Sequence, residues 1–79
     1  MLDRENFDSE KRAPGEQHAL QCLFLDRLHR IAERRNEWTP HDGVSSRRLL
    51  DHALYSTYMD CLAVGMRPVA RAVIAEVRR

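Results

Sequence analysis

The sequence contains few of the residues that interrupt helices, with three glycines and three prolines among 79 residues. It also lacks any stretch in which apolar and polar residues alternate as they do along a half-buried strand. No apolar run approaches the ~20 residues that a bilayer-spanning helix requires. These absences favour an all-α fold and argue against a membrane partner.

Cysteine is also scarce, since Cys22 and Cys61 are the two in the chain. The first twelve residues, MLDRENFDSEKR, lack the apolar segment of a secretory signal. We therefore expect a cytoplasmic protein with reduced thiols and no disulfide. Lys11 is the single lysine among 13 basic residues, and we take this arginine bias as the mark of a GC-rich, bacterial genome.

Net charge is close to zero, because 13 basic side chains face 12 acidic ones and give a formal charge of +1. A strongly basic domain of the kind that binds nucleic acid is not indicated. The arginines are nevertheless clustered, and an alternative interpretation is a nucleic-acid-binding regulator. The clusters are Arg27, Arg30 and Arg34, then Arg47 and Arg48, and finally Arg71, Arg78 and Arg79.

The length predicts one small domain with a marginal core. Residues 1–15 are charged and end in Pro14-Gly15, so we interpret them as a flexible tail. Residues 16–79 form the predicted domain. A domain of this size is commonly stabilised by a disulfide, a metal, oligomerisation or close helix packing.

The first predicted helix covers residues 16–36, where apolar residues recur every three or four positions. Its last turn carries Arg34 and Arg35, which suit the carboxyl end of a helix dipole. The break follows at Thr39-Pro40 and Asp42-Gly43. The predicted stripe of this helix is Leu20, Phe24, Leu28 and Ile31, widened by Leu23 and Ala32.

A second helix is predicted from Ser45, as N-cap, to about residue 64, with Val44 and Leu49 spaced as a hydrophobic staple. Gly65 suits the left-handed residue after its end, and Pro68 suits the first turn of a short third helix. The chain thus predicts a long antiparallel helical hairpin plus a short C-terminal helix. The main face of the second helix is Leu50, Ala53, Leu54, Thr57, Tyr58 and Cys61, and that of the third is Val69, Val73 and Val77 with Ala70 and Ile74.

The first two helices carry more apolar surface than one stripe each. Leu25 lies off the main stripe of the first helix, and Tyr55, Met59 and Leu62 form a second flank on the second. Extra apolar faces of this kind favour a protein partner, most simply a second copy in a symmetric helical-bundle dimer.

Trp38 completes the predicted contact set as an aromatic anchor, or else folds back as a lid over the loop between the first two helices. Arg47 and Arg48 open the second helix, where its dipole disfavours positive charge, and this placement suggests an acidic partner.

Metal binding and catalysis have little support in the sequence. His18 and Cys22 lie one helical turn apart and could share an ion, but His29 lies roughly 10 Å from Cys22 along the helix. No metal or phosphate-binding motif is present. We therefore interpret Cys22 and Cys61 as small buried hydrophobes. The sequence predicts a small non-enzymatic protein-interaction module, an adaptor, regulator or subunit, without a cofactor.

Overall fold

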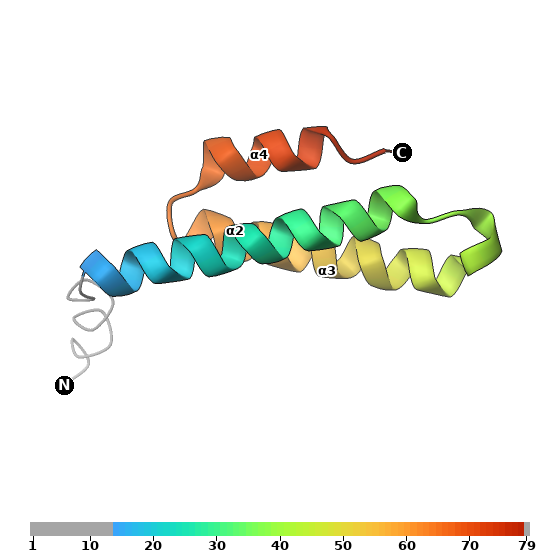
Figure 1. The fold of residues 1–79 in the computed structure, drawn as a ribbon, viewed down its shortest axis with the longest axis horizontal. Helices are drawn as coiled ribbons and strands as arrows, with labels where there is room; N and C mark the ends of the chain where they lie inside the picture. The colour runs from blue at the N-terminus through green and yellow to red at the C-terminus, as the bar shows by residue number, and fades with distance from the viewer. Residues whose placement is uncertain (1–13, 79) are drawn as a thin grey trace.

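The computed structural model describes residues 14–78 and confirms the all-α fold, with three α-helices, one 3-10 turn and no strand within that range (Figure 1). The predicted tail lies for the most part outside the described residues. The elements are α2 (Pro14–Glu37), the 3-10 turn η1 (Pro40–Asp42), α3 (Val44–Ala63) and α4 (Arg67–Ala75).

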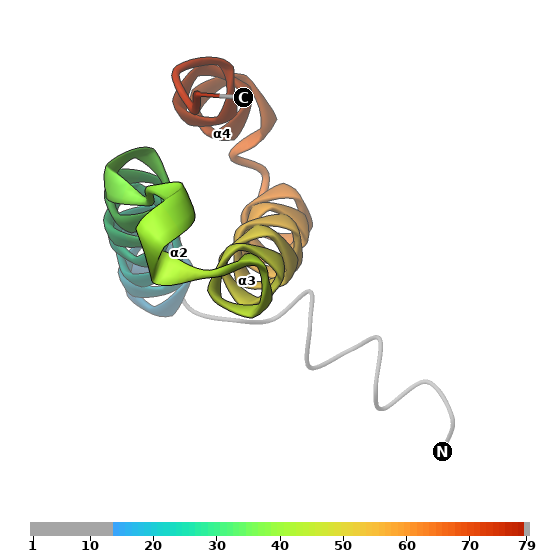
Figure 2. The ribbon, with the colours of Figure 1, turned by 90° about the vertical axis from the view of Figure 1, so that its right-hand side faces the viewer.

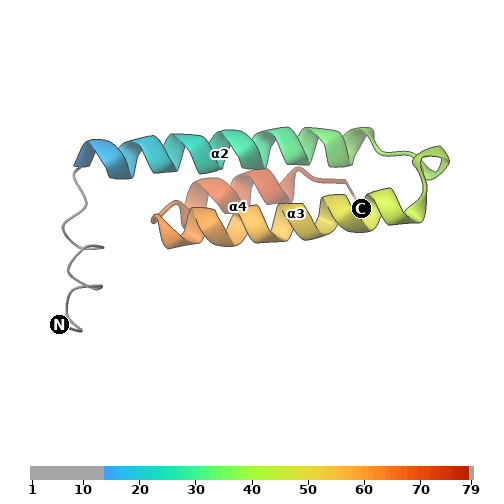
Figure 3. The ribbon, with the colours of Figure 1, turned by 90° about the horizontal axis from the view of Figure 1, so that it is seen from below.

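Helices α2 and α3 form the long antiparallel hairpin, closed by the turn at η1 (Figure 3). The short helix α4 turns back and lies over one face of this hairpin, where it contacts both α2 and α3 (Figure 2). Seen end-on, the three helices form a triangle, and the core lies between them. Within the described residues, no helix is long and apolar enough to cross a membrane.

The hairpin turn is built from Thr39 to Gly43. The backbone N–H of Thr39 donates to Oδ2 of Asp42 at 2.9 Å, which fixes the single 3-10 turn. Gly43 follows with φ +94°, a region that residues with a Cβ rarely adopt. The predicted break between the first two helices is therefore confirmed, although α2 begins two residues earlier and ends one residue later than the expected range of 16–36.

The expected start of the second helix was wrong. Helix α3 begins at Val44 with Gly43 as its N-cap, so Ser45 lies inside the first turn instead of capping it. The expected staple between Val44 and Leu49 is not supported, since both side chains are largely exposed. The turn at Gly43, with its own hydrogen bonds, determines where α3 begins, and the serine does not lie at the N-cap.

The end of α3 follows the prediction. Gly65 has φ +78°, the N–H of Met66 donates to the carbonyl of Cys61 at 2.9 Å, and the N–H of Gly65 donates to Leu62 at 3.0 Å. This pair of bonds is a Schellman motif. The side-chain amides of Gln17 and Gln21 also donate to the carbonyl of Val64, at 3.2 and 2.8 Å. The first turns of α2 are thereby fastened to the end of α3.

The side-chain amide of Asn36 fastens the residues after α4 to the opposite end of α2. The side chain of Asn36 donates from Nδ2 to the carbonyl of Glu76 at 3.2 Å and accepts from the N–H of Arg78 at 2.6 Å. We call this pair of bonds the Asn36 clip. It holds the residues after α4 beside the last turn of α2, near the hairpin turn.

The core is thin, because seven apolar residues within 14–78 are buried and Leu28 and Cys61 are the largest that are fully so. The predicted stripes contribute most of it, which confirms the helical periodicity. Cys22 corrects the expectation that both cysteines are buried, since its side chain is exposed. The buried apolar residues are Leu28, Ala32, Leu54, Cys61, Val64, Ala70 and Val73.

Candidate protein-binding surface

An apolar flank runs along the outer side of α3 and consists of Tyr55, Met59 and Leu62. These positions are spaced by four and three residues, so they share one side of the helix. Tyr55 is 63% exposed and Met59 is 44% exposed, while Leu62 is half-buried. The structure thus places the three predicted contact residues of this helix together, and we call them the α3 flank.

Leu25 lies elsewhere, and its expected outward position was wrong. Its side chain is half-buried and packs against the core. Leu23, which was expected to widen the buried stripe, is the exposed leucine of α2, at 50%. The buried side of α2 thus keeps Phe24, Leu28 and Ile31 of the predicted stripe and includes Leu25 beside them.

At the hairpin turn, Trp38 is fixed by polar and cation–π contacts. Its indole Nε1–H donates to the carbonyl of Gly43 at 2.9 Å. The guanidinium groups of Arg35 and Arg47 lie 5.9 and 5.3 Å from the centre of its ring. Trp38 therefore folds back over the turn between α2 and α3, and its side chain is partly buried there. The lid predicted as the alternative to an anchor is supported by this geometry.

An ion pair whose arginine is buried connects α2 to α3 beside Trp38. Nε of Arg35 lies 2.7 Å from Oδ1 of Asp51, and the Arg35 side chain is 6% exposed whereas that of Asp51 is 50% exposed. Arg47 lies 3.7 Å from the other carboxylate oxygen. Arg47 thus meets an acidic neighbour one turn further along its own helix, which offsets its unfavourable place near the helix N-terminus. Arg48 is exposed.

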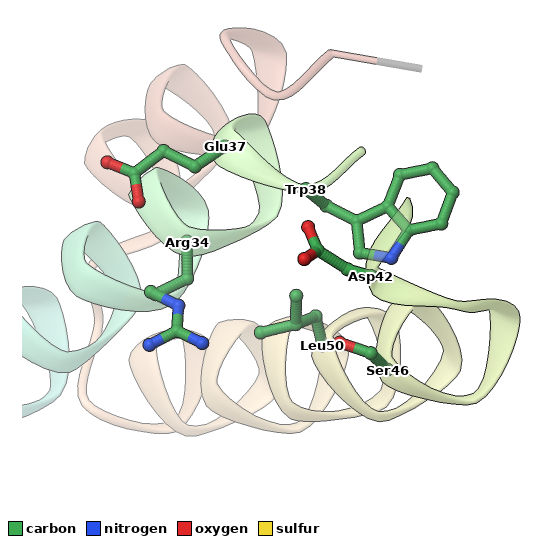
Figure 4. A pocket seen from close by; sticks show the side chains of 6 residues that line it. All are labelled: Arg34, Glu37, Trp38, Asp42, Ser46 and Leu50. Carbon is green, nitrogen blue, oxygen red and sulfur yellow. The ribbon is translucent and has the colours of Figure 1, made fainter. Parts of the chain in front are cut away.

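A first hollow of about 310 Å³ opens beside the turn (Figure 4). Glu37 points away from the other side chains, and Asp42 is engaged in the turn itself. Ser46 is the hydroxyl-bearing residue among the described residues of its lining. Its lining residues are Arg34, Glu37, Trp38, Asp42, Ser46 and Leu50.

A second hollow, of about 310 Å³, lies between α3 and α4 and adjoins the α3 flank through Tyr55. Its walls are mostly apolar and include two tyrosines. It extends the apolar surface of the flank toward α4. The lining residues are Asp51, Leu54, Tyr55, Tyr58 and Ile74.

The thiols differ in their surroundings. Sγ of Cys22 lies 3.5 Å from Nε2 of His18 on the exposed side of α2, a pair that could hold two positions of a metal ion. No group of three or more histidine, cysteine or acidic residues within 14–78 could complete such a site. Burial raises the pKa of the Cys61 thiol, and the nearby Asp60 carboxylate adds to this rise.

Comparison with known proteins gave no match: no family model, no curated protein and no solved structure is significantly similar to this chain.

Proposed function

We propose that the chain is a small, non-enzymatic protein-interaction module that assembles through the α3 flank, with a second copy of itself as the first partner. The observation that supports this most is the exposure of Tyr55 and Met59 on one side of a well-formed helix. Aromatic and methionine side chains are enriched where proteins meet. A shared face would also enlarge a core that is thin in a single chain.

The geometry suits a pair of α3 helices packed across a two-fold axis. A flank with residues spaced by four and three positions presents the narrow seam that helices use when they pack lengthwise. In a symmetric dimer the same flank serves both copies, so one apolar surface is enough for closure. The arginines beside the flank would then remain at the rim, where charge guides a partner and selects among partners.

The test is the mass of the full chain by native mass spectrometry and light scattering between about 1 and 100 μM, the range in which weak dimers form. We expect a dimer for the unaltered protein and a monomer for Met59→Glu, because a carboxylate would be buried unpaired in the seam. Leu49→Glu is the matched control, since Leu49 lies on another side of α3 and is 71% exposed. It should remain a dimer. A monomer throughout that range, or a dimer of Met59→Glu, would contradict this proposal.

Nucleic-acid binding stays the alternative prediction from the arginine clusters. Titration with duplex and single-stranded probes at two salt concentrations separates the two functions. Phosphate contacts weaken steeply as salt rises. A salt-sensitive complex with unaltered protein and none with Arg27→Gln or Arg34→Gln would favour the alternative.

A further inference from the structure

A third hollow, of about 340 Å³, lies where the hairpin turn meets the end of α4. Its lining combines four apolar residues with three arginines. None of the α3 flank residues lines it, so it can be occupied while the flank is engaged by a second copy. We call it the arginine hollow, and its lining residues are Arg35, Arg47, Leu54, Ile74, Ala75, Val77 and Arg78.

Arg35 is the informative residue of this hollow. Its guanidinium donates from Nε to Asp51 at 2.7 Å, and within residues 14–78 its two terminal nitrogens have no acceptor. Since no fully buried side-chain nitrogen or oxygen in this range lacks a partner, those nitrogens are the part of Arg35 that still reaches solvent. The residue as a whole is 5% exposed. A guanidinium that is this deeply buried and still lines an open hollow is suited to receive an anion.

The charge around the hollow is unbalanced. Three guanidinium groups line it, while Asp51, which pairs with Arg35 and Arg47, supplies a carboxylate. The surplus favours an anionic group, and the fork of an arginine matches the two oxygens of a carboxylate. The apolar lining residues Leu54, Ile74 and Val77 favour an aliphatic or aromatic group beside that charge.

We propose that the arginine hollow binds an acidic segment of a protein partner, with one carboxylate on the guanidinium groups of Arg35, Arg47 and Arg78. An adjacent apolar side chain of that segment rests on Leu54, Ile74 and Val77. The inference rests on the proposed function, which it extends by naming the chemistry of a second partner. The hollow meets the apolar surface beside the α3 flank at Leu54 and Ile74, so the two binding surfaces are continuous.

The test uses the full chain labelled with nitrogen-15 and a capped peptide with the sequence Gly-Asp-Phe-Glu-Gly as probe. In NMR titrations we expect the Nε–Hε signals of Arg35 and Arg47 to move, together with the amide signals of Ile74 and Val77. A peptide in which Asn and Gln replace the acidic residues should bind at least tenfold more weakly, because it retains the phenylalanine and lacks the charge.

Variants localise the binding. Arg78→Gln and Arg47→Gln should each weaken the peptide about fivefold, as loss of one charge-assisted contact does. Arg71→Gln makes the same change of charge at another exposed arginine, outside the hollow, and should leave affinity within twofold. Arg78 is exposed, so its replacement leaves the core intact.

Three outcomes would overturn the inference: no movement of the arginine signals, equal binding of the neutral peptide, or equal binding of inorganic phosphate. The last result would define a general anion site. The mass measurement on Met59→Glu decides the proposed function separately. If the protein is a dimer but the peptide does not bind at the arginine hollow, the inference is refuted and the proposed function still holds.

Discussion

The pair formed by Arg35 and Asp51 provides the sharpest test of how the hairpin is held. A double-mutant cycle with Arg35→Met and Asp51→Ala measures their coupling free energy. A fully buried pair costs about 3–5 kcal/mol when one partner is removed, and an exposed pair contributes about 0–1 kcal/mol. Because the Arg35 side chain is 6% exposed and that of Asp51 is 50% exposed, we expect a coupling of about 1–2 kcal/mol, between these limits.

The chain offers a matched control in Asp26 and Arg30. Their Nε–Oδ2 distance of 2.9 Å is similar, but their side chains are 60% and 77% exposed. The same replacements there should give about 0.3–0.5 kcal/mol, as for other exposed pairs one helical turn apart. Urea unfolding followed by far-UV circular dichroism, at one fixed protein concentration, gives the free energies of the unaltered protein and of all the variants in both cycles. A coupling for Arg35 and Asp51 no larger than that of the control would refute the reasoning.

Three further predictions concern the core, a turn and a thiol. Leu28→Ala should lower the free energy of unfolding by about 3 kcal/mol, since Leu28 is fully buried, whereas exposed Leu49→Ala should change it by less than about 0.5 kcal/mol in the same urea assay. Gly65→Ala should lower the free energy of unfolding by about 1–2 kcal/mol, measured by thermal unfolding, because an alanine at φ +78° is strained. The added Cβ contacts no other atom within 4 Å, so the backbone conformation alone sets this cost. Burial raises the pKa of Cys61, so the unfolded thiol ionises first and stability should fall as pH rises beyond the ordinary thiol pKa of about 8.5. Cys61→Ala should remove that slope, while Cys22→Ala should keep it; an unchanged slope in Cys61→Ala would refute this assignment.

The sequence predicted the features that depend on local chemistry. The hairpin and short third helix, the break at Thr39-Pro40, and Gly65 as a left-handed residue are all confirmed. Each follows from periodicity or from a conformational preference that acts within a few residues. The start of α3 was missed because Gly43, in a positive-φ conformation, outweighed the capping preference of Ser45.

The candidate site was predicted less well, because it depends on tertiary placement. From the sequence, Arg35 is a basic residue suited to the end of a helix. Its burial could not be predicted, because it depends on Asp51 of the neighbouring helix α3. Asn36 gave no local signal for its bonds to residues after α4. Leu25 packs against the core, and which residues beside the main stripe are covered depends on how the three helices lie together. The flank of Tyr55 and Met59 was recognised, since it lies on one helix whose buried side was correctly identified.

The Asn36 clip has a consequence for the order in which the native state opens. Helix α4 has nine residues, fewer than the roughly 12–15 at which an isolated helix becomes even marginally stable in water. Its helicity therefore depends on docking, and undocking and melting form one cooperative event. With one asparagine side chain holding its far end to α2, this segment is the unit whose amides should exchange first. The hairpin would persist as the slower-exchanging remainder, with the apolar face beneath α4 briefly open to solvent.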